Sequence, residues 1–353
     1  MATLKNIRIK RHYSIVVHDE NTVELRCGVW NPYAHTLKDE TNSGNLFKVI
    51  KLLDGQLSAI EIAEKLNLPR SNIESIIDHL QQLGVIEHTA STAFERYIDT
   101  CMPILTRPDH VSELNQKMPV TILGDSPLSE KIYELLKSSV AASQLNMVHA
   151  SDHIWLELQD SNDDWLHDGL LFNKKLEHFQ SLKNHYVILP QFPINPVVAR
   201  RFNRLANKLG ISWLFAAVDG PFLFIGPTIV PNIGACYECF ETRVMMNMRE
   251  IASYQKYKEA LVAGKVYHNT ISPIEPAVLS LVASHTTMEA LNFILTECAF
   301  TKNKVLSLYL PTMEVVFNEI FRVAGCSTCG SRIQRDDAEL YFDVRTLLQE
   351  QFA

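Results

Sequence analysis

The sequence predicts an α/β protein: an N-terminal winged helix-turn-helix domain followed by a larger α/β domain with a structural zinc site. Strand-like runs beside three helical runs in the first ninety residues indicate the winged helix. Strands and helices alternate over the rest of the chain, which favours a sheet that is largely parallel in its first half. Two Cys-x-x-Cys pairs there indicate zinc. We expect the winged-helix domain at 1–90, a connector at 91–118 and the α/β domain at 119–353.

The composition is that of a folded protein from a reducing compartment. The chain has 353 residues, 46% hydrophobic and 21% charged, which suffices for two domains of ordinary size. No apolar run approaches the roughly 20 residues that span a bilayer, and the N-terminus lacks the apolar core of a secretory signal. Seven cysteines, an odd number, suit the cytoplasm, where cysteine pairs more often bind metal than form disulfides. We expect a cytoplasmic protein without a membrane partner.

The strands of the first domain are short. Residues 13–18 and 22–30 are rich in β-branched and aromatic side chains, and a polar turn separates them. A third strand is expected at about 35–39, and residues 85–88 are expected to form a short return strand.

Three amphipathic helices lie between these strands. The first spans residues 45–55. The second begins with a capping box, because Ser58 is followed three residues later by Glu61. The same reasoning assigns a capping box to Ser71 and Glu74 of the third helix. The apolar stripe of this third helix consists of Ile73, Ile76, Ile77, Leu80 and Leu83.

A winged helix often binds DNA through its last helix, but the charges of this domain oppose that function. Residues 1–90 contain ten Lys and Arg against eleven Asp and Glu, and the helix at 71–83 has no Lys or Arg for phosphates. The net charge of −7 also disfavours nucleic acid. A structural accessory role and peptide binding stay open. An edge strand beside an apolar helix stripe is a groove for an added peptide strand, and the candidate residues are Thr36, Leu37, Ile73, Ile76, Ile77 and Leu80.

The second domain opens with an apolar strand that runs into Gly124 and then into an amphipathic helix. The helix at 275–295 is long and apolar enough for burial in a core or in an interface. A further helix is expected at 195–210, and further strands are expected at 153–158, 186–190, 212–218, 220–230 and 304–312.

The two cysteine pairs carry the most specific chemistry. Zn²⁺ prefers four tetrahedral soft ligands, and a two-residue spacer lets both sulfurs of a pair reach one ion. A single pair could be redox-active, but two pairs in one domain favour a structural site without an open coordination position. The expected ligands are Cys236, Cys239, Cys326 and Cys329. The isolated cysteines, expected to be buried thiols, are Cys27, Cys101 and Cys298.

Together these features resemble E1-like proteins related to ThiF and MoeB. The more specific likeness is to the Ocin-ThiF-like leader-peptide-binding partners of azoline-forming (TOMM) cyclodehydratases. The helix-turn-helix passage at 52–66 and the loop at 122–132 resemble this family weakly. The glycine-proline strand before the first cysteine pair, 226–243, and the strand pair before the second, 305–330, resemble it more specifically. The resemblance implies an E1-like, Rossmann-type second domain.

The loop after the first strand of this domain departs from active E1-like enzymes, which bind ATP with Gly-x-Gly-Gly-x-Gly. Here Gly124 is followed by Asp125, Ser126 and Pro127. Pro127 has no amide to donate, and Asp125 places negative charge where a triphosphate would sit. Charged residues that match no phosphate or magnesium motif, and are expected to be solvated at the surface, are Lys174, Lys175, Arg200, Arg201 and Asp219.

The resemblance implies a protein that is not catalytic alone. It would bind the leader peptide of a ribosomally made, bacteriocin-like precursor and present it to a YcaO-type ATP-dependent cyclodehydratase for azoline formation. The resemblance further implies a homodimer. The two cysteine pairs imply zinc as its cofactor, and the departure of the Gly124 loop from the ATP-binding motif implies no ATP on this chain. Two alternatives stay open: an E1-like enzyme that itself adenylates a peptide, and a zinc-containing winged-helix regulator.

Overall fold

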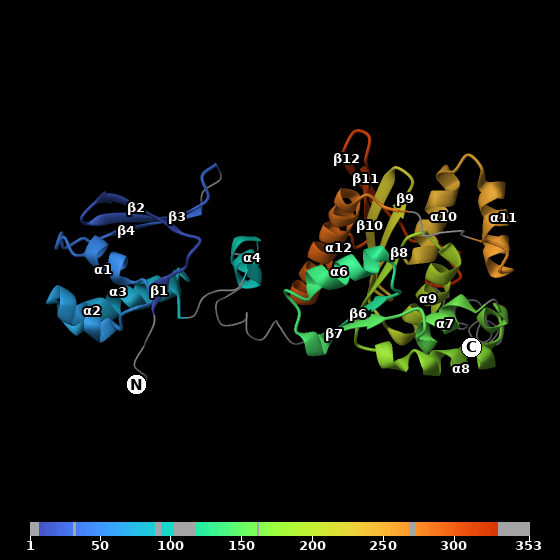
Figure 1. The fold of residues 1–353 in the computed structure, drawn as a ribbon, viewed down its shortest axis with the longest axis horizontal. Helices are drawn as coiled ribbons and strands as arrows, with labels where there is room; N and C mark the ends of the chain where they lie inside the picture. Colours follow the sequence, from blue (N-terminus) through green and yellow to red (C-terminus); the bar gives the residue numbers. More distant parts are fainter. Residues whose placement is uncertain are drawn as a thin grey trace, which may run out of the picture. The chain divides into compact units, whose positions relative to one another are not determined.

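The computed structural model describes residues 7–30, 33–88, 93–101, 118–160, 162–267 and 273–330. The chain divides into two compact units, Met1–Ser112 and Glu113–Ala353 (Figure 1).

The N-terminal unit contains two small antiparallel sheets and three packed helices. The three-stranded sheet has the order β2 (Ser14–Asp19), β3 (Thr22–Cys27), β4 (Tyr33–Lys38). The two-stranded sheet pairs β1 (Arg8–Ile9) with β5 (Ile86–Glu87). The helices are α1 (Leu46–Leu52), α2 (Ala59–Leu66) and α3 (Arg70–Gln82), and α4 (Ala93–Cys101) follows β5. The strands predicted near 35–39 and 85–88 are confirmed.

The core of this unit follows from the alternation of its strands. Val23 and Leu25 of β3 are fully buried, whereas Glu24 between them points to the other face of the sheet. Leu37 of β4 joins the same cluster. The sheet therefore presents one apolar face, which packs with the buried side chains of the three helices.

One of the two predicted capping boxes is confirmed. Ser58 Oγ accepts a hydrogen bond from the Glu61 amide at 3.3 Å, and the Glu61 carboxylate accepts one from the Ser58 amide at 2.7 Å. The second prediction is wrong, because α3 begins one residue before Ser71. The carboxylate of Glu74 pairs with Arg70 one turn earlier, at 2.8 Å, and does not cap the helix.

A seven-stranded sheet forms the centre of the C-terminal unit (Figure 1). Its order is β12-β11-β10-β9-β8-β6-β7. The pairs among β7, β6, β8 and β9 are parallel, and the pairs from β9 to β12 are antiparallel. The predicted parallel first half is therefore confirmed. The strands are β6 (Val120–Leu123), β7 (Leu145–Val148), β8 (Tyr186–Gln191), β9 (Trp213–Asp219), β10 (Phe222–Ile229), β11 (Lys304–Tyr309) and β12 (Glu314–Glu319).

Helices cover both faces of this sheet, as neighbouring side chains of β8 show. Tyr186 stacks on Phe293 of α12, whereas Val187 lies in the cluster that contains Phe202 of α9. The helix α6 packs along α12, and α9 contacts α7, α10 and α11. The helices are α6 (Pro127–Leu136), α7 (His153–Gln159), α8 (Gly169–His178), α9 (Pro196–Leu209), α10 (Tyr237–Asn247), α11 (Ile251–Val262) and α12 (Pro276–Thr296), with single 3₁₀ turns at Ala142–Gln144, Asp164–Leu166 and Gln180–Leu182.

The helix α12 has a core position. Among the described residues it is the one helix long and apolar enough to cross a membrane, yet 56% of its apolar window is buried inside the unit. Val282, Ala283 and Ala290 are fully buried, and α12 contacts β9 and β10. Such burial is typical of the core helix of a globular unit, one of the two positions that the sequence left open.

The strand predicted at 153–158 is wrong, because these residues form α7. The strand in this part of the sheet is β7, which the sequence reasoning missed. Four apolar residues in a run of six do not separate a buried strand from a short helix. The helix follows Asp152, whose backbone oxygen accepts from the Leu156 amide at 3.0 Å. An acidic residue at that end also suits the helix dipole.

Candidate metal centre and peptide groove

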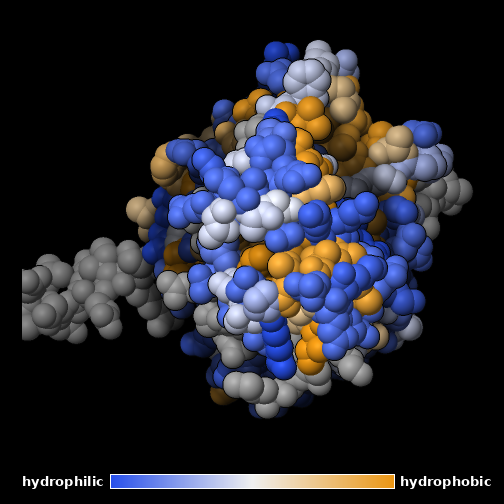
Figure 2. Space-filling model, turned by 90° about the vertical axis from the view of Figure 1, so that its left-hand side faces the viewer, coloured by the Kyte–Doolittle hydropathy of each residue, from blue (hydrophilic) through white to orange (hydrophobic). Residues whose placement is uncertain are grey.

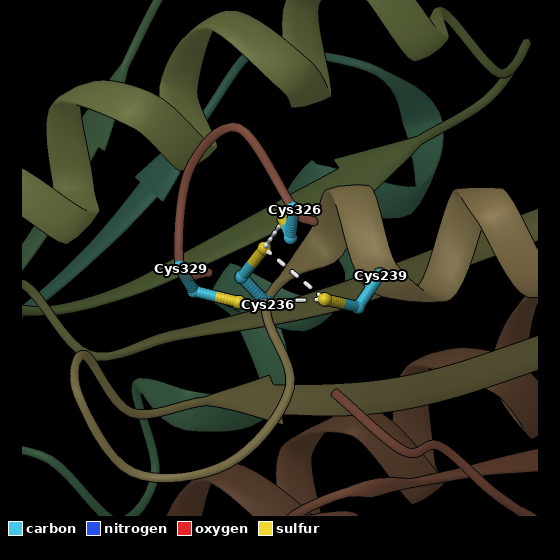
Figure 3. Close-up of side chains that lie close together, drawn as sticks. All are labelled: Cys236, Cys239, Cys326 and Cys329. Carbon is cyan, nitrogen blue, oxygen red and sulfur yellow. Dashed lines mark hydrogen bonds between the residues drawn. The ribbon is translucent and has the colours of Figure 1, made fainter. Parts of the chain in front are cut away.

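The four predicted zinc ligands meet in one cluster. Cys236 caps the N-terminus of α10 and Cys239 lies in its first turn, whereas Cys326 and Cys329 lie in the turn after β12. Their sulfurs point toward one another (Figure 3), and all four lie within 4.8 Å of one another. The two pairs, separated by ninety residues of chain, therefore form one donor set.

The sulfur separations fit a tetrahedral zinc ion. A Zn–S distance of about 2.3 Å places sulfurs about 3.8 Å apart. The observed Sγ–Sγ distances are 3.9 Å for Cys236 and Cys239, 3.5 Å for Cys236 and Cys326, and 3.3 Å for Cys239 and Cys329. Thiolates are the form that binds metal, and four sulfurs at these separations can hold a zinc ion.

A buried carboxylate joins the two halves of this cluster. Glu238, between the first two cysteines, accepts hydrogen bonds from Ser327 Oγ at 2.5 Å and Thr328 Oγ1 at 2.6 Å. It also pairs with Arg204 of α9 at 2.8 Å. Burial raises the pKa of Glu238, but the hydrogen bonds from these three residues outweigh it, and the pKa is lowered. We call these contacts of Glu238 with Ser327, Thr328 and Arg204 the clamp. The sequence reasoning missed it, although Glu238, Ser327 and Thr328 lie inside the two Cys-x-x-Cys motifs.

The isolated cysteines lie outside this cluster. Cys27 is half-buried and Cys298 is exposed. The expectation that they are buried thiols is therefore wrong for Cys298, which follows the end of α12. The side chain of Cys101 lies outside the described residues.

A groove in the N-terminal unit lies between β4 and α3. It has a volume of about 540 Å³. β4 is an edge strand, because β3 is its one partner among the described strands. In Figure 2, where this unit faces the viewer, hydrophobic side chains gather near the centre of the face between hydrophilic ones. The groove is lined by Thr36–Thr41, Ser43, Asn45, Leu46, Leu68, Asn72, Ser75, Ile76, His79 and Leu80.

The structure divides the predicted groove residues into two groups. Thr36 and Leu37 of β4 line the groove together with Ile76 and Leu80 of α3. The remaining two, Ile73 and Ile77, are 0% and 1% exposed and belong to the core of the unit. Helical periodicity predicted the apolar face of α3 correctly, but it does not distinguish the side chains of this face that line the groove from those that lie in the core.

Asp39 fixes the loop after β4, whose residues Asp39–Thr41 and Ser43 line part of the groove. Its carboxylate accepts hydrogen bonds from the Ser43 hydroxyl at 2.5 Å and the Thr41 hydroxyl at 2.6 Å, and from both amides. These bonds, led by that of Ser43, lower the pKa of Asp39 to about 2. The loop is therefore held by a carboxylate that is ionised at neutral pH.

The space beside the backbone of Gly124 is filled by the side chain of Trp155. Gly124 has a φ of +90°, and a Cβ placed on it would lie 2.9 Å from the indole of Trp155. The Trp155 ring therefore packs on the glycine, where a nucleotide's phosphates would approach the backbone. A cavity of about 350 Å³ beside the loop is lined by both residues and by side chains that include Phe192, Ile194 and Tyr257.

The polar groups of this loop also bind within the protein. Ser126 Oγ accepts from the Ser129 amide at 3.2 Å, so this donor at the start of α6 is engaged. Asp125 accepts from the Ala150 amide at 3.1 Å and thereby ties the loop to the segment after β7. Pro127, at the first helical position, has no amide to offer.

Two of the five charged residues that were expected to be solvated at the surface, Lys175 and Arg201, are buried. Arg201 is 2% exposed and donates to Asp163 at 2.7 Å, while Arg200 pairs with the same carboxylate at 2.8 Å. Lys175 is 9% exposed and pairs with Glu157. These cations therefore hold the fold and do not point into the cavity beside Gly124.

Comparison with known proteins supports this architecture. A family model described as a winged helix-turn-helix matches residues 26–88. No curated protein matches the chain. A solved heterocyclase in complex with substrate and cofactor is similar with a TM-score of 0.62 at 16% identity, over 92% of this chain and 39% of that one. The heterocyclase TruD is similar with a TM-score of 0.60 at 17% identity, over 92% of this chain and 43% of that one.

A third similar structure matches over nearly its whole length. MccB from E. coli has a TM-score of 0.52 and 14% identity, over 93% of this chain and 97% of that one. Identities this low show a shared fold alone. The chain thus has the fold of MccB and of about two fifths of the two heterocyclases.

Proposed function

We propose that this protein binds the leader peptide of a ribosomally made precursor and presents the precursor to a YcaO-type cyclodehydratase that forms azolines. The leader adds a strand to β4 and covers the groove beside α3. The E1-like, zinc-containing unit docks the enzyme, and the protein acts as a homodimer in the cytoplasm. Capture supports catalysis by raising the effective concentration of the core peptide at the partner's active site.

The observation that carries this proposal is the groove between β4, at the edge of its sheet among the described strands, and the exposed part of α3. An edge strand offers unpaired amides and carbonyls to an extended peptide. Ile76 offers an apolar side chain beside it, and Asn72, Ser75 and His79 offer polar contacts. The likeness to two heterocyclases supports the assignment of the peptide to azoline chemistry.

Ile76 is the residue that tests the groove. It is half-buried and lines the groove, whereas Leu80 is 1% exposed and its replacement by Asp would unfold the domain. The Ile76→Asp variant places a carboxylate under the bound peptide, which costs about 1–3 kcal/mol without a partner. We expect leader binding, measured by fluorescence polarisation, to weaken roughly 5- to 140-fold.

The matched control is Gln81→Asp, which adds the same charge at an exposed position of α3 outside the groove. This variant should bind the leader as the wild type does. Circular dichroism must show that both variants are folded. Undiminished leader binding by a folded Ile76→Asp variant would refute the proposal that the leader binds in this groove.

The alternative of an adenylating enzyme is opposed by the loop at Gly124. Trp155 packs where phosphates would lie, and Ser126 engages a helix amide that would bind them. We therefore propose that the partner enzyme, and not this chain, binds ATP. Isothermal titration of the protein with ATP and Mg²⁺ should give no heat of binding, and micromolar affinity would favour the adenylating enzyme.

A further inference from the structure

Three side chains outside the cysteine cluster and the groove converge beside α7. His153 and Glu157 lie one turn apart on this helix, and His178 is the last residue of α8. Glu157 Oε1 lies 3.2 Å from His153 Nε2 and 3.3 Å from His178 Nδ1. The three donor atoms all lie within 4.8 Å of one another. One carboxylate oxygen is thus shared by two imidazole nitrogens.

The two nitrogen–oxygen separations match those of ligands around one small divalent ion. Zinc bonds to nitrogen and oxygen at about 2.0–2.1 Å, which places tetrahedral ligands about 3.3–3.4 Å apart. The Nδ1 atom of His178 is buried and has no hydrogen-bond partner among the described residues, although Glu157 Oε1 lies near it. A nitrogen that is close to an oxygen but makes no hydrogen bond has its lone pair free for a metal.

The other oxygen of the carboxylate is held in place. Lys175, 10% exposed at its side chain, contacts Glu157 Oε2 and lies 3.6 Å from Asp160. This contact turns Oε1 toward the two histidines, as outer contacts do for metal ligands in other proteins. The charges of Glu157, Asp160 and Lys175 sum to −1 with neutral histidines, which favours a cation.

We propose that His153, Glu157 and His178 form a second metal site that binds a zinc ion. Two imidazoles and one carboxylate match the ligand types that zinc takes, and three protein ligands leave a fourth position for water. His153 and His178 are 66% and 34% exposed at their side chains, so the ion reaches solvent and exchanges readily. The site differs in this from the cysteine cluster, whose Cys236 and Cys239 are buried.

The experiment measures the number of zinc ions bound per chain of the full-length protein. A mild carboxylate chelator removes exchangeable zinc while the cysteine site stays loaded, and equilibrium dialysis at pH 7.5 then adds zinc at micromolar free concentrations. The wild type should take up one further ion and reach two per chain. The variants His153→Ala and His178→Ala should bind that ion more than about 100-fold more weakly, beyond the effect of losing an outer contact.

His167→Ala is the matched control, because this exposed histidine precedes α8 and lies outside the cluster. It should reach two ions per chain. Zinc should also shift the imidazole nitrogen resonances of His153 and His178 and leave those of His167 unchanged. A wild type that stays at one ion, or a His178→Ala variant that binds the second ion normally, would overturn the site and leave an ion-paired cluster without metal.

Discussion

Replacing Glu238 by Gln tests whether the two cysteine pairs are held together as the structure shows. Gln keeps the shape of the side chain but turns one acceptor oxygen into a donor. Arg204 then loses its counter-charge, both Ser327 and Thr328 lose an ionised acceptor, and one of the two hydroxyls faces an NH2 group in place of an oxygen. The perturbation leaves all four sulfurs in place, so it separates the clamp from the metal ligands themselves.

The size of the effect follows from the burial of the pair. Breaking a buried ion pair by removing one partner costs about 3–5 kcal/mol. The side chains of Glu238 and Arg204 are 11% and 19% exposed. Solvent screening therefore reduces the loss to about 2–3 kcal/mol. A domain of this size melts about 2–4 °C lower per kcal/mol, so the C-terminal unit should melt about 4–12 °C lower.

The assay compares thermal unfolding with the rate at which a chelator removes zinc. Glu241→Gln is the matched control, because Glu241 lies in the same helix and pairs with Lys258 at 2.8 Å, away from the second cysteine pair. Both variants should melt earlier. Only Glu238→Gln should also weaken zinc binding, by about 10- to 100-fold, as is usual for lost outer contacts.

Two results would refute this reasoning. Equal zinc affinity in the wild type and Glu238→Gln would show that the clamp does not position the cysteines. Equal loss of zinc from Glu238→Gln and Glu241→Gln would show that the effect comes from general destabilisation of α10.

Two further predictions concern local structure. Gly330→Ala should weaken zinc retention, because a Cβ there would lie 2.4 Å from the backbone oxygen of Cys326; inductively coupled plasma mass spectrometry measures the zinc per chain. The hydrogen bond from Ser43 and the other bonds to its carboxylate lower the pKa of Asp39 from 3.8 to about 2. The ionised carboxylate therefore stabilises the fold fully above pH 3.8, and this stabilisation is lost as the pH falls toward 2. The free energy of unfolding of the N-terminal unit should therefore fall over this range, and Asp39→Asn should remove that part of the pH dependence.

Each of these predictions has an opposing outcome. Full zinc occupancy in Gly330→Ala under chelator challenge would mean that the second cysteine turn can shift to admit a methyl group. An unchanged acid unfolding curve in Asp39→Asn would mean that the bonds of this carboxylate do not stabilise the loop.

The sequence predicted most elements whose signal is local. The capping box at Ser58 and the strand predicted at 22–30 depend on neighbours along the chain, and both are confirmed, the strand as β3 over Thr22–Cys27. The strand predicted at 153–158 is wrong because the apolar residues of this run have no clear period. That error also hid the cluster of His153 and Glu157. Four residues apart, they lie about 6 Å from each other on a helix but about 13 Å apart on a strand.

By itself, the sequence determined the four sulfur donors and the edge strand beside an apolar helix, because spacing along the chain fixes ligand type and amphipathic faces. The tertiary structure alone decided which donors meet and which faces stay open. It joined cysteines ninety residues apart, buried Ile73 and left Ile76 in the groove, and laid Trp155 over Gly124. These outcomes depend on close packing between segments distant in the chain, and no local period encodes that packing.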